Sequence, residues 1–385
     1  MRPRFPAKSF VTALLVGAVA CAGIGPFRGR ISGARFASLI EAMSGPGAEF
    51  DSDNLVSNES SYLDIAGQLE RLVTKGGAYL GVGPSQNFSY IALTRPDIAF
   101  IVDVRRKNLL HHLIFKAIFE MAASPAEFLA IELSRPIPSR EAESLAETVA
   151  ALDAAPADES AYRENLTAIQ SRIRERYLPS ATAADMASVA DILRAFFERG
   201  LDIRYEQPRF DAQLDVIRIP NYRNFLLTVG PAGRWRNFLA DPDDFAFVKE
   251  LQRRNRVIPL VGDFAGDVAL RSVGRYLAAR DQRVSAFYLS NVEYYLLPQG
   301  RLGPFVANLG QLPHDEDTLL IRNFIDIAAR WHPAAIDERM SVTVLQTLPH
   351  FVERARSGRG YFSYREIMTD YLRPARSDSA ADHSP

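Results

Sequence analysis

The stretch from Ala78 to Asn108, AYLGVGPSQNFSYIALTRPDIAFIVDVRRKN, decides the fold. A short apolar run ends in Gly81 and Gly83, a segment with helical character follows, and a second apolar run ends in Asp103, 20 positions after Gly83. Doubly wound α/β folds receive a nucleotide with this order of strand, glycine turn, helix, strand and acid. The glycines allow close backbone approach to the ligand, and the acid accepts hydrogen bonds from ribose hydroxyls.

The glycine motif is incomplete, because Asn87 or Phe88 stands where GxGxxG has its third glycine. A glycine turn after a strand is also compatible with a purely structural connection between strand and helix. The spacing of Asp103 favours a ligand site, since an isolated carboxylate at a strand end needs a partner or water.

Composition describes a globular protein without strong charge. The chain has 385 residues, 47% of them hydrophobic and 24% charged, which suits one large domain or two ordinary ones. A net charge of −1 argues against a nucleic-acid partner. The single cysteine excludes a disulfide framework and a cysteine-based zinc site, and the six histidines show no metal-ligand spacing, so we predict no metal. For the adjacent pair His111 and His112 we expect one buried and one exposed ring.

Two later apolar runs extend the predicted sheet. The run RVIPLVG, residues 256–262, is followed by Asp263. The run VSAFYL, residues 284–289, is followed by Ser290 and Asn291. Continuous apolar strands that alternate with helices predict an α/β fold with a doubly wound, mostly parallel sheet. Between these runs and Asp103, residues of about 139–200 have apolar positions at helical spacing, which predicts a helical insertion.

The N-terminus resembles an export signal. Basic residues precede the apolar run Phe10 to Ala22, which is short for a membrane-spanning helix. Cys21 follows Ala18-Val19-Ala20, so the site resembles a lipobox, with membrane attachment through Cys21, or a signal-peptidase site. We therefore assign residues 1–22 to a signal peptide or membrane anchor and the protein to the cell envelope. A cytoplasmic protein with an uncleaved apolar N-terminus is the alternative.

The remaining boundaries follow from local composition. We predict a glycine-rich linker over 23–50, a single α/β domain over 51–373 and a disordered tail over 374–385. Early in the domain, Ser57 or Asn58 is expected to cap a helix with apolar positions from Tyr62 to Leu72.

Polar groups stand at the ends of all four predicted strands. They are the turn with Gly81 and Gly83, then Asp103, Asp263 and Asn291. Because ligands of open α/β sheets bind at the carboxyl ends of strands, we expect these groups to line one site. Each has an alternative role: Asp263 could cap the following helix, and Asn291 could serve a turn.

With these motifs the chain resembles the class I S-adenosylmethionine-dependent methyltransferases over about 55–125 and 220–298. GVGPSQN is similar to the glycine motif near the methionine part of that ligand, and Asp103 to the acid that holds its ribose. GDF resembles the motif that places an acid, here Asp263, and an aromatic ring, here Phe264, at adenine. SNVEYY, with Asn291, resembles the segment that lines the acceptor site.

Three longer strings narrow the resemblance. FDSDNLVSNESSYL, LQRRNRVIPLVGDFAG and FYLSNVEYYL are similar to a bacterial family of methyltransferase-like proteins, some of them lipoproteins. The resemblance implies a Rossmann-like fold and S-adenosylmethionine as cofactor, with the methyl acceptor open. The chain departs from the pattern in three ways: the glycine motif is shortened, the helical insertion separates Asp103 from Asp263, and no acceptor-activating base is evident.

Three functions therefore remain as alternatives. The first is a methyltransferase-like protein that binds S-adenosylmethionine. The second is a non-catalytic envelope lipoprotein that retains the fold as a binding or scaffold module. The apolar N-terminal run and Cys21 favour it, because an exported protein would not meet cytoplasmic cosubstrates such as S-adenosylmethionine in quantity. A dinucleotide-dependent oxidoreductase is disfavoured because the full GxGxxG is missing, and a serine hydrolase because Ser85 lies outside a G-x-S-x-G elbow.

Overall fold

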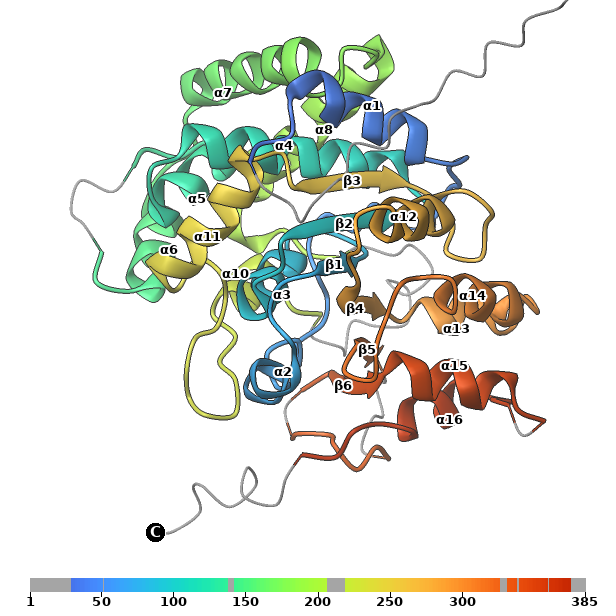
Figure 1. The fold of residues 1–385 in the computed structure, drawn as a ribbon. Helices are drawn as coiled ribbons and strands as arrows, with labels where there is room; N and C mark the ends of the chain where they lie inside the picture. The colour runs from blue at the N-terminus through green and yellow to red at the C-terminus, as the bar shows by residue number, and fades with distance from the viewer. Residues whose placement is uncertain are drawn as a thin grey trace, which may run out of the picture.

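A computed structural model describes residues 29–50, 52–137, 142–205, 219–325, 331–337, 339–358 and 360–374. Its centre is a six-stranded sheet with the order β3-β2-β1-β4-β5-β6 (Figure 1). The strands are β1 (Ala78–Gly81), β2 (Ile98–Asp103), β3 (Val257–Val261), β4 (Val284–Ser290), β5 (Leu319–Ile325) and β6 (Ser341–Thr347). The neighbours from β3 to β5 are parallel, and β6 is antiparallel to β5.

The four strands predicted from sequence all lie in this sheet, so the prediction of an α/β fold with a mostly parallel sheet is confirmed. Every residue of β1, β2 and β3 is buried. This burial explains why these strands have continuous apolar sequences instead of alternating ones, since both faces of the sheet are covered.

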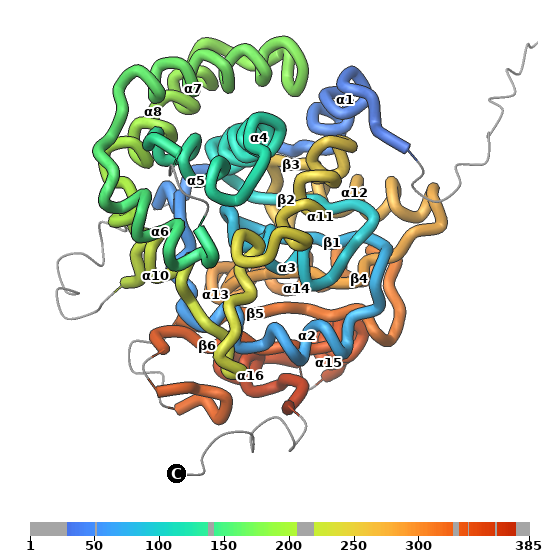
Figure 2. The backbone as a smooth tube through the Cα atoms, turned by 90° about the vertical axis from the view of Figure 1, so that its left-hand side faces the viewer, coloured from blue at the N-terminus to red at the C-terminus, as the bar shows by residue number. Residues whose placement is uncertain are grey.

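Helices cover both faces of the sheet (Figures 1 and 2). The first half of the chain contains α1 (Gly33–Met43), α2 (Ala66–Leu72), α3 (Gln86–Thr94), α4 (Arg106–Met121), α5 (Pro125–Leu133), α6 (Leu145–Ala154), α7 (Glu159–Arg172) and α8 (Ala183–Arg199). The second half contains α10 (Tyr222–Leu226), α11 (Pro242–Arg253), α12 (Ala269–Ala278), α13 (Val292–Leu296), α14 (Leu302–Leu309), α15 (Leu348–Arg356) and α16 (Tyr364–Thr369). Of these, α4 packs against β2 and β3, α3 against β1 and β4, and α12 against β2.

The range expected as a helical insertion, about 139–200, is largely helical where it is described. It contains α6, α7 and α8, with a π-helical turn, Ile173–Tyr177, after α7. Both α7 and α8 lie along α4 (Figure 2). A capping box between Thr182 and Asp185 begins α8, and the Asp185 carboxylate also accepts two hydrogen bonds from Arg106 of α4. The insertion is therefore joined to the helix that follows β2.

Three local expectations are wrong. Within the expected linker, residues 33–43 form α1, whose side chains Phe36, Leu39 and Ile40 are buried in the core. The helix expected from Ser57 or Asn58 begins only at Ala66, after a series of turns. Both His111 and His112 are buried, because α4 is covered on nearly all sides by the sheet and other helices.

The signal segment with Cys21, residues 23–28 of the expected linker and the tail from 375 lie outside the described residues. Within the part of the chain that the structure describes, no helix has the length and apolar character needed to cross a bilayer.

Candidate functional site

A cavity of about 420 Å³ opens at the carboxyl ends of β1, β2, β3 and β4. Predicted site residues from all four strand ends line it, namely Gly83, Asp103, Asp263, Phe264 and Asn291. The parallel register brings these residues to one edge of the sheet, with β1 between β2 and β4. These five residues therefore line one cavity, and their role in binding a ligand stays a prediction.

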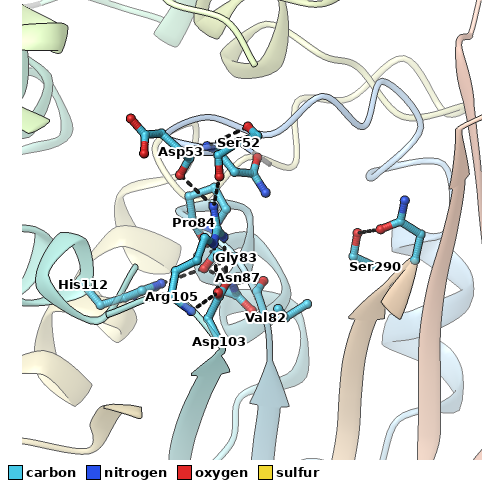
Figure 3. A network of polar contacts seen from close by, with 12 residues as sticks. Ser52, Asp53, Val82, Gly83, Pro84, Asn87, Asp103, Arg105, His112 and Ser290 are labelled. Atoms are coloured by element: carbon cyan, nitrogen blue, oxygen red, sulfur yellow. Dashed lines mark hydrogen bonds and ion pairs between the residues drawn. The ribbon is translucent and has the colours of Figure 1, made fainter. Parts of the chain in front are cut away.

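Gly81, the sixth predicted residue, does not line the cavity. A Cβ at this position would lie 1.9 Å from Oδ1 of Asn87, so glycine makes room for that side chain. Asn87 Nδ2 donates to the carbonyl oxygens of Val82 (2.9 Å), Gly83 (3.2 Å) and Pro84 (2.8 Å), as Figure 3 illustrates. Asn87, one of the two residues that stand where GxGxxG has its third glycine, thus holds the turn in shape. Gly83 has a φ of +76° and lines the cavity.

His112 supports the same turn from α4. Its Nε2 lies 2.8 Å from the Gly83 carbonyl oxygen, so that nitrogen carries the proton and donates it (Figure 3). Burial lowers the pKa of His112 to about 4. His112 is consequently neutral at physiological pH and acts as a support for the glycine turn.

Asp103 is clamped by Arg105 at the end of β2. The Arg105 Nε and backbone N–H both donate to Asp103 Oδ1 at 2.9 Å, and its second guanidinium nitrogen donates to Oδ2 at 2.6 Å (Figure 3). A carboxylate has about four acceptor positions, so roughly one remains for a ligand. Asp103 was predicted to accept hydrogen bonds from a ribose, and the contacts with Arg105 restrict that role.

Arg105 also fixes the segment that forms one wall of the cavity. Its other terminal nitrogen donates to the carbonyl oxygens of Ser52 (3.2 Å) and Asp53 (2.7 Å). The guanidinium carbon lies 5.6 Å from the centre of the Phe50 ring, which meets Tyr295 edge-on. Residues 48–50 of the expected linker also line the cavity, so the end of that segment is part of this wall.

Asp263 and Phe264 follow β3. Asp263 Oδ1 accepts from the backbone N–H of Ala265 at 2.8 Å, and Oδ2 is paired with Arg301. The capping alternative is wrong, because α12 begins at Ala269 with Val268 at its N-cap. Phe264 is 4% exposed and its ring packs against Phe287 and Phe305, so little of its surface is open to the cavity that it lines.

At the end of β4 the chain turns sharply. Ser290 has a φ of +52°, a left-handed conformation that costs a residue with a Cβ free energy. Asn291 stands at the N-cap of α13, yet its side chain makes no capping hydrogen bond there and lines the cavity. Asn291 Oδ1 lies 3.4 Å from the Ser290 hydroxyl (Figure 3).

Glu59 is the residue of the site that sequence reasoning missed. It lines the cavity and is 2% exposed. Its Oε1 accepts hydrogen bonds from Tyr288 (2.8 Å) and Ser290 (2.6 Å), and its Oε2 accepts one from Gln86 (2.6 Å). Burial raises the pKa of Glu59 above its ordinary value, and the three hydrogen bonds oppose that rise. The only sequence signal was its place in FDSDNLVSNESSYL, one of the strings with family resemblance.

A family model matches most of the chain. Residues 55–190 and 212–380 match the family described as a domain of unknown function, DUF7790. No curated protein matches the chain at a significant level. The matched ranges contain the four strands whose ends form the cavity, together with Glu59 and Arg105. The chain therefore belongs to the DUF7790 family.

Proposed function

We propose that the cavity binds S-adenosylmethionine and that the protein is a methyltransferase-like protein. The observation that carries the proposal is the meeting of Gly83, Asp103, Asp263 and Asn291 in one cavity of about 420 Å³ at four parallel strand ends. Its size falls within the range of small-molecule sites. Ligands of open α/β sheets bind at such an edge.

The strand order supports the finer proposal of a doubly wound, methyltransferase-like sheet. The chain places its strands in the order β3-β2-β1-β4-β5-β6, so the direction of winding reverses between β1 and β4. Doubly wound nucleotide-binding folds use the same order and bind their ligand where the direction reverses. The cavity lies at this reversal, bounded by residues that follow β1 and β4.

Each part of the ligand has a place along the sheet edge. Phe264 and Asp263, after β3, would hold adenine, and the remaining acceptor position of Asp103, after β2, would hold a ribose hydroxyl. The backbone around Gly83, after β1, would approach the amino-acid part, since its positive φ and missing Cβ leave that side of the turn open. Asn291, after β4, would line the acceptor site.

The ligand supplies an activated methyl group, and the chain supplies position. Transfer depends largely on holding donor and nucleophile in line, so rigid turns at the strand ends are the relevant contribution. Asn87 and His112 hold the turn at Gly83, and Arg105 holds the wall at residues 52–53.

Calorimetry of the purified protein against S-adenosylmethionine, S-adenosylhomocysteine and NAD tests the proposal. We expect both adenosyl ligands to bind and NAD to bind weakly or not at all. Asp103→Ala removes a charge-assisted acceptor worth about 1.5–3 kcal/mol, so adenosyl affinity should fall roughly ten- to a hundredfold. Circular dichroism must first establish that the variant is folded. Wild-type protein that binds no adenosyl ligand overturns the proposal.

A second candidate is a non-catalytic envelope module on the same fold. The apolar N-terminal run and Cys21 favour it, because they resemble a lipoprotein signal. It differs from the first candidate in location, and the fractionation described in the Discussion separates the two.

A further inference from the structure

Glu59 occupies the point of the cavity between β1 and β4. It lies on the loop that precedes α2, and its hydrogen-bond partners come from β4 and from the first turn of α3. Sheet and helix thus converge on one carboxylate, which faces the cavity.

The donors around Glu59 are themselves held in place. The Gln86 side-chain oxygen accepts from the Ser57 hydroxyl, so its amide nitrogen is directed at Glu59. The same nitrogen lies 3.3 Å from the Tyr90 hydroxyl, which donates to the Tyr62 carbonyl oxygen at 3.0 Å. Such a network is oriented to receive an ionised carboxylate, because each group that contacts Glu59 donates to it.

The donors are all neutral, so Glu59 has no cationic partner among the described residues. The two arginines that line the cavity are engaged elsewhere, Arg105 with Asp103 and Arg301 with Asp263. The titratable groups that act electrostatically on Glu59 from neighbouring elements are phenols, and burial raises the pKa of each, so they stay neutral; they are Tyr79, Tyr90, Tyr288 and Tyr364. A buried carboxylate without a counter-charge is unfavourable.

The cavity as a whole is lined by more acidic than basic side chains. Four carboxylates line it, from Glu49, Glu59, Asp103 and Asp263, against the guanidinium groups of Arg105 and Arg301. Two negative charges are therefore unmatched, and Glu59 is the one that is buried. A ligand with a positive charge would relieve this imbalance, whereas an anionic ligand would increase it.

We propose that Glu59 receives a positively charged group of the ligand. The inference rests on the proposed function, which places adenine after β3 and ribose after β2. The groups beyond the ribose then reach the end of β1 and β4, where Glu59 lies. Beyond the ribose, S-adenosylmethionine carries two cationic groups, the sulfonium and the α-ammonium. We assign the sulfonium to Glu59, a charge that S-adenosylhomocysteine lacks although it keeps the ammonium.

The proposal predicts a linkage between binding and protonation. Burial raises the pKa of Glu59, so the ionised form is disfavoured in the free protein. A cationic group beside Glu59 favours the ionised form, so S-adenosylmethionine should release protons on binding. The affinity for S-adenosylmethionine should therefore rise as pH rises through the pKa that Glu59 has in the free protein. The affinity for S-adenosylhomocysteine should change less over the same range.

The test compares the two ligands by calorimetry at several pH values, in buffers of different ionisation enthalpy. We expect the full wild-type chain to prefer S-adenosylmethionine by about tenfold or more and to release protons only with that ligand. Glu59→Gln should remove the preference and the proton release. Glu164→Gln removes a carboxylate from an exposed position of α7, outside the residues that line the cavity, and should leave both unchanged.

The outcomes separate this inference from the proposed function. Equal wild-type affinities without proton release overturn the inference and leave adenosyl binding intact. An equal loss of both affinities in a folded Glu59→Gln protein also overturns it, because that result assigns Glu59 a purely structural role. Wild-type proton release needs no variant, so the test survives if Glu59→Gln fails to fold. Absence of binding by either ligand overturns both proposals.

Discussion

The side chain of Asn87 fills the space in which residue 81 would carry its Cβ, with Oδ1 only 1.9 Å from that point. The same oxygen accepts a hydrogen bond from the Tyr79 hydroxyl at 2.9 Å, and the amide nitrogen binds three successive carbonyl oxygens of the turn. The first glycine of the motif is therefore required by an internal side chain and not by a ligand.

Gly81→Ala should be costly for this reason. The new methyl group must displace Asn87, so we expect the free energy of unfolding to fall by about 3 kcal/mol in urea denaturation. Gly83→Ala meets no atom within 4 Å and adds only the strain of its positive φ, about 1 kcal/mol. Gly303→Ala, with open space in α14, should be neutral or stabilising by about 0.5 kcal/mol. A Gly81 variant as stable as the Gly83 variant would contradict this account.

Asp103→Asn should destabilise the fold as well as affect any ligand. Arg105 is 8% exposed and would remain buried without its counter-charge, which typically costs about 3–5 kcal/mol. Lys107→Met breaks a more exposed ion pair with Asp53 and should cost less than about 1 kcal/mol. Urea unfolding of both variants measures the difference. Similar small losses would show that the Arg105 clamp contributes little to stability.

Continuous apolar runs make part of the site predictable from the sequence. Apolar runs identify the four strands, and parallel strands end at one edge, so the sequence alone is enough to place Asp103, Asp263 and Asn291 together. The glycine turn after β1 is predictable too. The role of Gly81 is not, because the motif does not tell which glycine lines the cavity and which makes room for the Asn87 side chain.

Contacts between distant segments are beyond sequence reasoning. Glu59 meets Tyr288 and Ser290 more than 200 positions later, and no local periodicity links them. Residues 48–50 of the cavity wall come from the segment expected as a linker, and the neighbouring residues 52–53 are held by Arg105, a contact that no local pattern predicts. Irregular segments that are held by side chains have no period to detect.

Location separates the two candidate functions. Fractionation of cells that express wild type and Cys21→Ser should find the wild type with the membrane and the variant soluble or unprocessed, if Cys21 carries lipid. Several acyl chains hold a protein firmly at a bilayer, whereas one holds it only marginally. Wild-type protein in the soluble cytoplasm would refute export and leave the adenosyl-binding protein as the favoured candidate.

Glu132 should make the stability of the fold depend on pH. Its carboxyl group is 2% exposed on α5, Tyr222 donates to it at 2.7 Å, and burial raises its pKa from 4.5 to about 8. Between these values the folded protein keeps a proton that the unfolded chain has lost. The contribution of Glu132 to stability is therefore fully present below about pH 4.5 and is lost as pH rises towards 8, by up to about 1.4 kcal/mol per pH unit.

Glu132→Gln keeps an acceptor for the Tyr222 hydroxyl and cannot ionise, so it should remove this slope. Urea unfolding at pH 5, 6.5 and 8 should find the variant increasingly stable relative to wild type as pH rises. Other groups with shifted pKa, such as His112, contribute equally to both proteins and cancel in the difference. Glu164→Gln, at an exposed position of α7, is the matched control and should give a difference that is flat with pH. A flat difference for Glu132→Gln as well would mean that Glu132 ionises in the folded protein as it does in water, and that water or a local opening reaches it between α5 and α10.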